Sequence, residues 1–312
     1  MKALIAAPSE ATKIRLADVP DPTPTPSQAV VTVRTVSLNR GEIRALAYAD
    51  EGSRLGWDLS GVIEQAATDG SGPAVGTRVV GLVTGGAWST HVAVPTTHLA
   101  PLPDNITFAT ASTLPISGLT ALRALSKGGL LYSKRVLITG AAGGLGRWAI
   151  QLASQAGADV TCVVGRPERT QGLRELGASQ ILINPTLATG LERKYDLILE
   201  SVGGRSLATS LASVAPLGTV VSLGNSSDET VSFNAPNFYR QAGATLYGFI
   251  IFSELERFPS AARDLTWLMT QLVAGRLQSN IAFEASWHEP AEAFERLMSR
   301  SLAGKAVLHI EP

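Results

Sequence analysis

The stretch V-L-I-T-G-A-A-G-G-L-G at residues 136–146 decides the fold of this chain. A short run of apolar and β-branched residues leads into a glycine-rich turn, and R-W-A-I-Q-L-A-S-Q-A at residues 147–156 continues as a good helix former. A strand, a glycine turn and a helix in this order are typical of a nucleotide-binding βαβ unit. We therefore expect a buried strand at residues 136–139 with a phosphate-binding turn after it.

The turn departs from the dinucleotide fingerprint at one position. Aligned to that fingerprint, Ala141, Gly143 and Gly146 occupy the three glycine positions, so the first glycine is replaced by alanine. Gly143 lets the backbone approach a pyrophosphate, Gly146 lets the helix pack closely on the strand, and the helix N-terminus offers free N–H groups to phosphates. A glycine-rich turn also serves plain packing, so the neighbouring strands are needed to support a cofactor site. The predicted cofactor-binding residues of the turn are Gly140, Ala142, Gly143, Gly144, Leu145 and Gly146.

The end of the second strand of this unit points to the kind of dinucleotide. In NAD enzymes an acidic residue about twenty positions beyond the glycines holds the ribose 2′-hydroxyl. Here the strand ends V-V-G-R-P-E-R, so Gly165 stands in place of the acid, and Arg166 and Arg169 follow. Guanidinium groups bind a 2′-phosphate through paired, charge-assisted hydrogen bonds. This pattern predicts NADPH, with all three residues at the cofactor; the alternative is that both arginines decorate an exposed helix start beside Glu168.

The C-terminal part of the chain alternates short apolar runs with helical segments, as a parallel sheet covered on both faces does. Six strands suit a doubly wound fold, and they are expected at residues 136–139, 159–164, 180–183, 196–200, 219–223 and 245–249. Helices are expected at residues 261–274 and 290–299. A last apolar run at residues 306–310 has no place in that sheet.

The first hundred residues are rich in proline, glycine and β-branched runs, with turn signals about every ten residues. This pattern predicts a separate β-rich domain to which the last strand can return. Its strands are expected at residues 29–36, 61–65, 78–83 and 89–94.

Composition excludes several classes of partner. The 312 residues are 45% hydrophobic and 17% charged, and 26 basic side chains balance 26 acidic ones. No net charge draws the chain to nucleic acid or to an anionic membrane, and no segment predicts a membrane helix or an export signal. We expect a cytoplasmic protein with a small-molecule substrate. The single cysteine, Cys162, lies in an apolar run and is expected to be a buried strand residue.

Beyond the glycine turn, several motifs resemble the medium-chain dehydrogenase/reductase superfamily, specifically its zinc-independent quinone oxidoreductase branch. They cover nearly the whole chain, and their order and spacing are specific. They are G-W-D-L-S-G-V-I-E at 56–64, V-G-T-R-V-V-G at 75–81, G-G-A-W-S-T-H-V-A-V-P at 85–95, A-S-T-L-P-I-S-G-L-T-A-L-R-A-L at 111–125, S-V-G-G at 201–204 and G-K-A-V-L at 304–308.

The resemblance implies an α/β architecture with a GroES-like β-barrel catalytic domain and a doubly wound Rossmann domain. The implied boundaries are 1–114 for the catalytic domain, 115–255 for the NADP-binding domain and 256–312 for the return to the catalytic domain. It also implies a homodimer that pairs through the sheet edge at the sixth Rossmann strand, and a nicotinamide held in a cleft between the domains.

Zinc-dependent relatives hold their metal with cysteine and histidine ligands. The matching positions here are Leu38, Trp57 and Ile116, none of which ligates zinc, so no metal is expected. Without a Lewis acid to polarise an alcohol or a simple carbonyl, the natural chemistry is hydride addition to an activated acceptor.

The resemblance also assigns residues to the nicotinamide and the acceptor. Asn39 matches an asparagine beside the nicotinamide or the substrate carbonyl, Thr120 a threonine at the nicotinamide amide, and Lys305 a lysine near the cofactor. An ordinary turn asparagine, a helix-packing threonine and an exposed lysine are the alternatives. Further cofactor-binding positions are Ser201, Val202, Leu223, Gly224, Asn225, Phe249, Ile250 and Ile251.

Aromatic side chains are candidates for the walls of the acceptor pocket, with core packing as the alternative. They are Tyr48, Trp57, Trp88 and Phe252. No proton donor has a convincing spacing, so water is expected to supply the proton after hydride transfer, with Tyr48 as a reserve catalytic donor.

The sequence thus predicts a zinc-independent NADPH-dependent oxidoreductase that reduces a quinone or an α,β-unsaturated carbonyl. Two alternatives stay open. A specialised enoyl reductase of a biosynthetic pathway is favoured by the segment at residues 40–56, which is shorter than in many relatives and carries Leu55 where they have proline. A non-catalytic NADPH-binding protein is the second.

Overall fold

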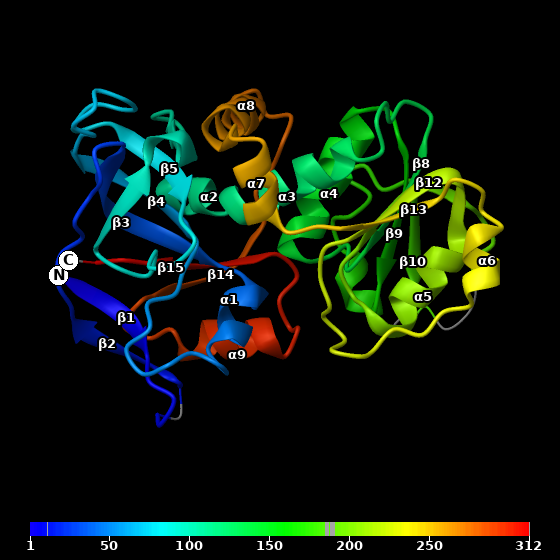
Figure 1. The fold of residues 1–312 in the computed structure, drawn as a ribbon, viewed down its shortest axis with the longest axis horizontal. Helices are drawn as coiled ribbons and strands as arrows, with labels where there is room; N and C mark the ends of the chain where they lie inside the picture. Colours follow the sequence, from blue (N-terminus) through cyan, green and yellow to red (C-terminus); the bar gives the residue numbers. More distant parts are fainter. Residues whose placement is uncertain (11, 185–186, 188–190, 312) are drawn as a thin grey trace. The chain divides into compact units, whose positions relative to one another are not determined.

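The computed structural model describes residues 1–10, 12–184, 187 and 191–311. The chain divides into two compact units (Figure 1). Unit 1 comprises Met1–Leu119 and Leu255–Pro312, and unit 2 comprises Thr120–Glu254. Each unit has its own sheet and its own apolar core.

Unit 2 is built on a six-stranded parallel sheet with the order β10-β9-β8-β11-β12-β13. The strand of this sheet that comes first in the chain, β8, lies in the middle, and the chain order reverses between β8 and β11. This is the doubly wound arrangement that the sequence predicts. The strands are β8 (Arg135–Thr139), β9 (Asp159–Val164), β10 (Gln180–Ile183), β11 (Tyr195–Glu200), β12 (Val214–Ser222) and β13 (Thr245–Gly248).

The central strands of unit 2 are apolar throughout because helices and loops cover both faces of a parallel sheet. Leu137, Ile198 and Val220 belong to one buried cluster, and Cys162 is fully buried in β9, as expected from its apolar surroundings. The helices of unit 2 are α4 (Gly144–Gln155), the short 3-10 helix η2 (Pro167–Thr170), α5 (Gly204–Ser213) and α6 (Ala235–Tyr239). The helix α3 (Pro115–Ser126) begins in unit 1 and ends in unit 2.

Unit 1 contains a seven-stranded sheet with the order β14-β15-β3-β4-β5-β7, in which β6 also pairs with β3. The long strand β3 has bulges in its pairing with β4, which bend it so that it serves several neighbours. The strands are β3 (Gln28–Leu38), β4 (Asp58–Gln65), β5 (Arg78–Leu82), β6 (His91–Pro95), β7 (Leu99–Pro101), β14 (Ile281–Ser286) and β15 (Lys305–His309). Strands β1 (Lys2–Ala6) and β2 (Ile14–Asp18) form a separate antiparallel pair.

The last strand returns to the N-terminal sheet, as the sequence predicts. Strand β15, red in Figure 1, lies between β14 and β3 and pairs antiparallel with the end of β3. In this register Ala306 is opposite Leu38. The pairing therefore brings Lys305, at the start of β15, next to Asn39, which directly follows β3.

The remaining helices complete unit 1. The expected helices at 261–274 and 290–299 are present, and no end differs from the expected one by more than one residue. They are α8 (Ala261–Val273) and α9 (Ala291–Met298), and the others are α1 (Arg40–Ala45), α2 (Phe108–Ser112), η1 (Thr96–His98) and α7 (Ile251–Arg257), which crosses the boundary between the units.

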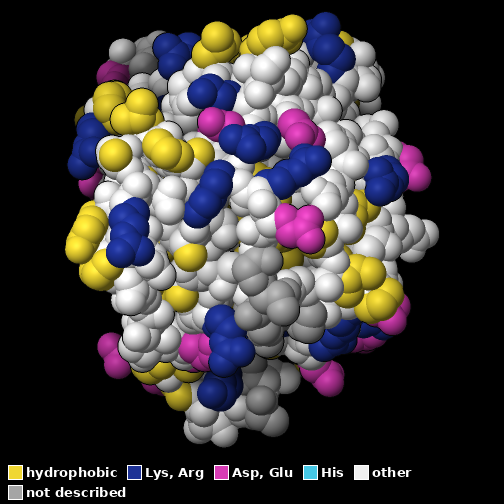
Figure 2. All heavy atoms as spheres, turned by 90° about the vertical axis from the view of Figure 1, so that its right-hand side faces the viewer, with side chains coloured by type: hydrophobic (Ala, Val, Ile, Leu, Met, Phe, Trp, Pro, Cys, Tyr) yellow, Lys and Arg dark blue, Asp and Glu magenta, His cyan; other side chains and the backbone are white. Residues whose placement is uncertain are grey.

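The surface carries mixed charge. On the face shown in Figure 2, lysine and arginine side chains are interspersed with aspartate and glutamate. Within the described part of the chain, no helix combines the length and the apolar character needed to cross a membrane.

Candidate active site

The glycine turn connects the end of β8 to the start of α4. Gly140 has a φ of +61°, a conformation that favours glycine, and Gly143 is the residue before the first helical turn. A side-chain carbon built on Gly146 lies 2.5 Å from the carbonyl oxygen of Ala141, so only glycine lets α4 pack this closely on the turn. One built on Gly143 meets only the carbonyl oxygen of Gly140, at 3.3 Å, so the outer side of the turn is open. The two glycines therefore have different structural roles.

A buried carboxylate that the sequence analysis missed organises the neighbouring loop. Glu200, at the end of β11, is fully buried and accepts four hydrogen bonds. The donors are the Thr139 hydroxyl (3.1 Å), the backbone N–H of Val202 (3.0 Å), the backbone N–H of Gly203 (3.0 Å) and the Ser206 hydroxyl (2.7 Å). These bonds fix the loop at the point where the strand order reverses, the usual ligand position in doubly wound sheets. The signal in the sequence is an acidic residue that ends the apolar run L-I-L-E.

The predicted cofactor residues of the other strands gather at the same edge of the sheet. The Ser201 hydroxyl donates to the carbonyl of Thr139 (3.0 Å), which joins the β11 loop to the glycine turn. The Leu223 N–H donates to the carbonyl of Glu200 (2.9 Å), and the Phe249 N–H to the carbonyl of Ser222 (2.9 Å). The parallel strands β8, β11, β12 and β13 thus present the residues predicted at 140–146, 201–202, 223–225 and 249–250 at their carboxyl ends.

The segment after β9 carries the predicted ribose residues. Gly165 and Arg166 are exposed, Arg169 is half-buried in η2, and its N–H donates to the carbonyl of Arg166 (3.1 Å). Because β9 is the neighbour of β8, this segment follows the strand next to the glycine turn.

In unit 1, Asn39 and Lys305 are joined in a buried polar network. The Lys305 ammonium donates to Asn39 Oδ1 (2.7 Å) and to Asp58 Oδ2 (3.2 Å), and Asn39 Nδ2 donates to Asp58 Oδ2 (2.8 Å). Asp58 is fully buried, and Lys305 is only 4% exposed, so the alternative of an exposed lysine is wrong. This ion pair and its two bonds to Asn39 hold the amide of Asn39 in one orientation.

Asp58 is the centre of the network. Besides Asn39 and Lys305, it accepts the Ser37 hydroxyl (2.7 Å) and the backbone N–H of Ile116 (2.7 Å) in the first turn of α3. The donors come from the end of β3, the start of β15 and a helix N-terminus, which favours negative charge. The residues that hold Asp58 therefore lie in a strand or a helix or directly next to one.

A second carboxylate, Glu42, lies in the same buried region. It accepts the backbone N–H groups of Asn39 (2.5 Å) and Trp57 (2.5 Å) and thereby caps the first turn of α1. Complete burial, together with the nearby charge of Asp58, raises the pKa of Glu42 to about 8, although Lys305 and the two N–H donors act in the opposite direction. The ammonium group of Lys305 thus pairs with Asp58 and also acts through its charge on Glu42.

The positions that match zinc ligands border this network. Leu38 and Ile116 are buried, and Trp57 packs on Gly41, where an added side-chain carbon lies 2.7 Å from the indole. None of the three side chains offers a donor for a metal. Among the described residues, no group of three or more His, Cys, Asp or Glu side chains is arranged to hold a metal ion.

The four aromatic side chains predicted to line the acceptor pocket differ in how exposed they are. Trp88 has no exposed surface and packs against Phe294 (ring centroids 5.3 Å apart) in the core of unit 1, so it is a packing residue and presents no face to a ligand. Tyr48 is 91% exposed, and Trp57 and Phe252 are half-buried. Thr120 is buried in α3.

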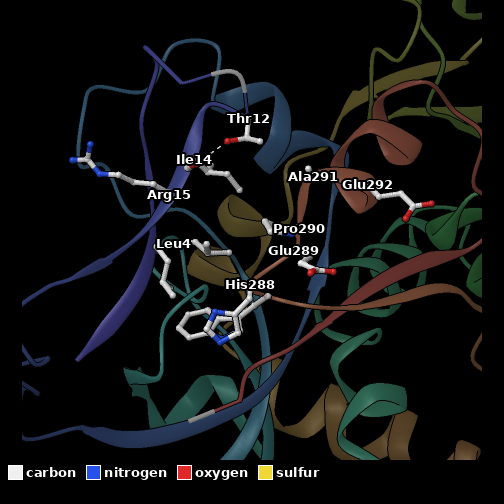
Figure 3. Close-up of a pocket in the computed structure, with 11 residues that line it drawn as sticks. Leu4, Thr12, Ile14, Arg15, His288, Glu289, Pro290, Ala291 and Glu292 are labelled. Atoms are coloured by element: carbon white, nitrogen blue, oxygen red, sulfur yellow. Dashed lines mark hydrogen bonds between the residues drawn. The ribbon is translucent and has the colours of Figure 1, made fainter.

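A cavity of about 410 Å³ in unit 1 contains none of the predicted site residues (Figure 3). Among its lining residues, Leu4 and Ile14 are buried, and Arg15 and Glu292 are exposed. Arg15 already pairs with Glu51 (2.8 Å) and Glu292 with Arg296 (2.5 Å). Because both of these side chains are already engaged and none of the predicted site residues lines the cavity, we assign no ligand to it.

Two family models match the chain in the order that its fold requires. The alcohol dehydrogenase GroES-like domain matches residues 25–104, and the zinc-binding dehydrogenase model matches residues 144–267. The chain belongs to the medium-chain dehydrogenase/reductase superfamily. This confirms the resemblance to that superfamily found in the sequence.

Solved structures share the fold of this medium-chain dehydrogenase/reductase over its whole length. The Escherichia coli quinone oxidoreductase complexed with NADPH is 22% identical with a TM-score of 0.88, and 99% of each chain is covered. The quinone oxidoreductase from Coxiella burnetii is 24% identical, with a TM-score of 0.83 over 100% of this chain and 99% of that one. The CurK enoyl reductase is 22% identical, with a TM-score of 0.84 over 99% of both chains.

Curated relatives include much larger proteins. The highly reducing polyketide synthase phiA of Fungal sp. is 26% identical over 295 residues, which are 90% of this chain and 11% of that protein. The spectinabilin polyketide synthase system protein NorB of Streptomyces orinoci is 33% identical over 209 residues, 64% of this chain and 9% of that protein. The chain thus spans about a tenth of the length of these relatives.

Proposed function

We propose that this medium-chain dehydrogenase/reductase transfers hydride from NADPH to a quinone or an α,β-unsaturated carbonyl without a catalytic metal. The observation that carries the proposal is the fixed amide of Asn39. Its Oδ1 accepts from Lys305 and one Nδ2–H is given to Asp58, while the second Nδ2–H has no partner among the described residues. That N–H is available to donate to the carbonyl oxygen of an acceptor.

The network both orients the amide of Asn39 and polarises it. When bound, NADPH supplies the hydride, and reduction of a quinone or an enone then places negative charge on the acceptor oxygen. The ammonium of Lys305 polarises the Asn39 amide through Oδ1, which strengthens donation from its N–H. A preorganised donor of this kind stabilises the charge that develops during the reaction.

The metal-free chemistry is supported by the residues at the matching zinc positions. Leu38, Trp57 and Ile116 offer hydrocarbon or indole groups where a metal site needs thiolate, imidazole or carboxylate. An activated acceptor is the substrate class that suits such a site, because its own conjugation makes it electrophilic.

The residues of unit 2 fit the dinucleotide. The open outer side of Gly143 and the N-terminus of the twelve-residue helix α4 suit a pyrophosphate, and Arg166 and Arg169 suit a 2′-phosphate where Gly165 replaces an acid. Two solved neighbours, from Escherichia coli and a mycobacterium, are complexed with NADPH.

The proposal is tested by Asn39→Ala, with Tyr48→Phe as a companion. Loss of one donor to the developing oxyanion lowers kcat about 100-fold, with little change in the Kd for NADPH. A wild-type kcat in Asn39→Ala would contradict the role of the amide. We propose that water supplies the proton, so Tyr48→Phe retains the wild-type rate; a large loss would instead identify Tyr48 as the donor.

A specialised enoyl reductase is the second candidate, because the curated relatives include polyketide synthases and one solved neighbour is an enoyl reductase. Reduction rates distinguish this candidate, because an enoyl reductase should reduce a conjugated acyl thioester much faster than a free enone of the same chain length. A non-catalytic NADPH-binding protein would bind the cofactor and oxidise none of it with any acceptor.

We also propose a homodimer that pairs through the edge strand β13. This strand is hydrogen-bonded only to β12 in the described sheet, and Thr245 and Leu246 on it are exposed. An exposed strand edge is a template for pairing with a second copy. Light scattering should give twice the chain mass of 32.7 kDa, and Leu246→Lys should give the monomer mass. A monomeric wild-type protein would contradict this pairing.

A further inference from the structure

Arg147 is a buried cation in the first turns of α4, beside the phosphate-binding turn. Its side chain is 7% exposed, although arginine is rarely buried without a carboxylate partner. Its guanidinium forms no ion pair with any described carboxylate, and burial lowers the pKa of Arg147 from its ordinary value. An arginine remains charged even so. No carboxylate in the described part of the chain therefore balances this positive charge.

The guanidinium joins two segments that are far apart in the sequence. Its Nε donates to the carbonyl of Ala142 in the glycine turn (3.2 Å), and its NH2 group donates to the carbonyl of Gln171, directly after η2 (2.9 Å). It also lies against Gly172, where an added side-chain carbon would be 3.4 Å from its NH1 group. Arg147 thus ties the segment at residues 166–171 to the turn. Arg166 and Arg169 lie on that segment.

We propose that Arg147 is a specificity-determining residue for a 2′-phosphorylated nicotinamide dinucleotide. It positions the segment that carries Arg166 and Arg169, and its charge is balanced by the phosphate groups of the bound dinucleotide. This inference rests on the proposed cofactor site and assigns it a residue that does not belong to the glycine fingerprint.

Two features separate this role from simple packing. A residue needed only for packing is served by an apolar side chain, which avoids the cost of burying a charge. Arg147 donates to one carbonyl in the turn that suits a pyrophosphate and to another in the segment that suits a 2′-phosphate. The donors of one guanidinium group therefore hold both segments in place. The guanidinium is therefore placed where it influences both anionic groups of the cofactor.

The test compares the Kd values of NADPH and NADH by calorimetry for the wild-type protein, Arg147→Lys, Arg147→Gln and a control. Lysine keeps the charge, but its single nitrogen does not reproduce the fork; glutamine keeps an N–H donor and loses the charge. The control is Arg174→Gln, which removes an exposed arginine that also donates to a backbone carbonyl, that of Ser179 (3.1 Å).

We expect Arg147→Gln to raise the Kd for NADPH at least about tenfold and the Kd for NADH by a smaller factor, so that the preference for NADPH falls. Arg147→Lys should retain most of the affinity for NADH and lose part of the preference. Arg174→Gln should match the wild-type protein. A purely structural role would lower the melting temperature and both affinities by the same factor, leaving the preference unchanged.

Wild-type affinities and a wild-type preference in both Arg147 variants would overturn the inference. If Arg147→Gln fails to fold, Arg147→Lys alone decides, since it keeps the buried charge. Failure of the proposed reaction is distinguishable, because a wild-type protein that binds NADPH but reduces no acceptor still shows the change in preference. A wild-type protein that binds neither dinucleotide overturns both.

Discussion

The ammonium of Lys305 lies 2.7 Å from the side-chain oxygen of Asn39, although 266 positions separate the two residues in the chain. The antiparallel pairing of β15 with β3 brings them together, and Asp58 at the start of β4 completes the group. Three strand ends thus build one polar centre inside unit 1.

Replacing Lys305 by methionine should lower both stability and activity. The variant leaves the buried carboxylate of Asp58 without its cation, which costs about 3–5 kcal/mol of unfolding free energy. It also frees the amide of Asn39 to rotate, so kcat falls. Denaturant unfolding and steady-state kinetics measure the two effects.

Two further variants control this experiment. Lys2→Met removes an exposed pair with Asp18 and should change the unfolding free energy by less than about 1 kcal/mol. The double variant Lys305→Met with Asp58→Asn removes both charges and should recover part of the lost stability. If Lys305→Met is as stable as the wild-type protein, the ion pair does not hold the network together.

The stability of the protein should fall as the pH rises from about 4.5 to about 8. The pKa of Glu42 is raised to about 8 in the folded protein. Between these pH values the folded state keeps a proton that the unfolded state has released, so unfolding becomes easier with pH, by up to about 1.4 kcal/mol per pH unit. Below this window both states are protonated, and above it both are ionised, so the contribution is constant on either side.

Glu42→Gln should remove this part of the pH dependence. At low pH the protonated carboxyl group of Glu42 still places an oxygen at each of the two N–H groups, whereas glutamine offers one acceptor oxygen. The variant is therefore less stable at low pH but loses no further stability through the window. Chemical denaturation at a series of pH values measures both the unfolding free energy at low pH and its slope with pH. An unchanged slope in Glu42→Gln would assign the pH dependence to another group.

The two glycines of the turn should respond differently to alanine. In Gly146→Ala the new carbon would meet the backbone of Ala141 at 2.5 Å, so α4 must shift, and both stability and NADPH affinity fall. In Gly143→Ala the carbon meets only one carbonyl oxygen at 3.3 Å, so the melting temperature stays near that of the wild-type protein. NADPH affinity still falls, because the carbon occupies the open side of the turn. Equal effects on melting temperature would refute this division of roles.

Cys162 should resist alkylation in the native protein. It is fully buried in β9, and burial raises the pKa of its thiol to about 12, which leaves almost no reactive thiolate at neutral pH. Mass spectrometry after iodoacetamide treatment should show labelling only when denaturant is present. Stoichiometric labelling of the native protein would show that β9 opens readily.

The sequence predicted the doubly wound sheet well, because its strands are buried on both faces and read as unbroken apolar runs. All six strands are present, two with the predicted bounds, residues 159–164 and 180–183. The strand β12 begins at Val214, earlier than residue 219, since its first half contains Pro216 and Gly218, which usually mark a turn.

Several elements of unit 1 escaped prediction, and β14 and α1 did so for clear local reasons. The edge strand β14 is only partly buried, and so its apolar signal is weak. The short helix α1 depends on Glu42, which accepts the N–H groups of Asn39 and Trp57. The bond to Trp57 is a tertiary contact that no local pattern shows.

The centre of the site was predicted in part. Asn39 and Lys305 were found through resemblance, but Asp58, Glu42 and Glu200 were not, because a carboxylate in a strand or a helix usually indicates exposure. Their burial follows from donors supplied by distant segments, such as the Ile116 N–H and the Ser206 hydroxyl. Arg147 was taken only as the start of a helix former, since its two carbonyl partners become visible only in three dimensions.

The measurement that tests the central claim most directly is NADPH and NADH oxidation across a panel of quinones and α,β-unsaturated carbonyls, with metal chelated throughout. We predict acceptor-dependent oxidation that is faster with NADPH than with NADH and is unaffected by the chelator. An absence of turnover with every acceptor, or activity that disappears on chelation and returns with zinc, would contradict the proposed metal-free hydride transfer.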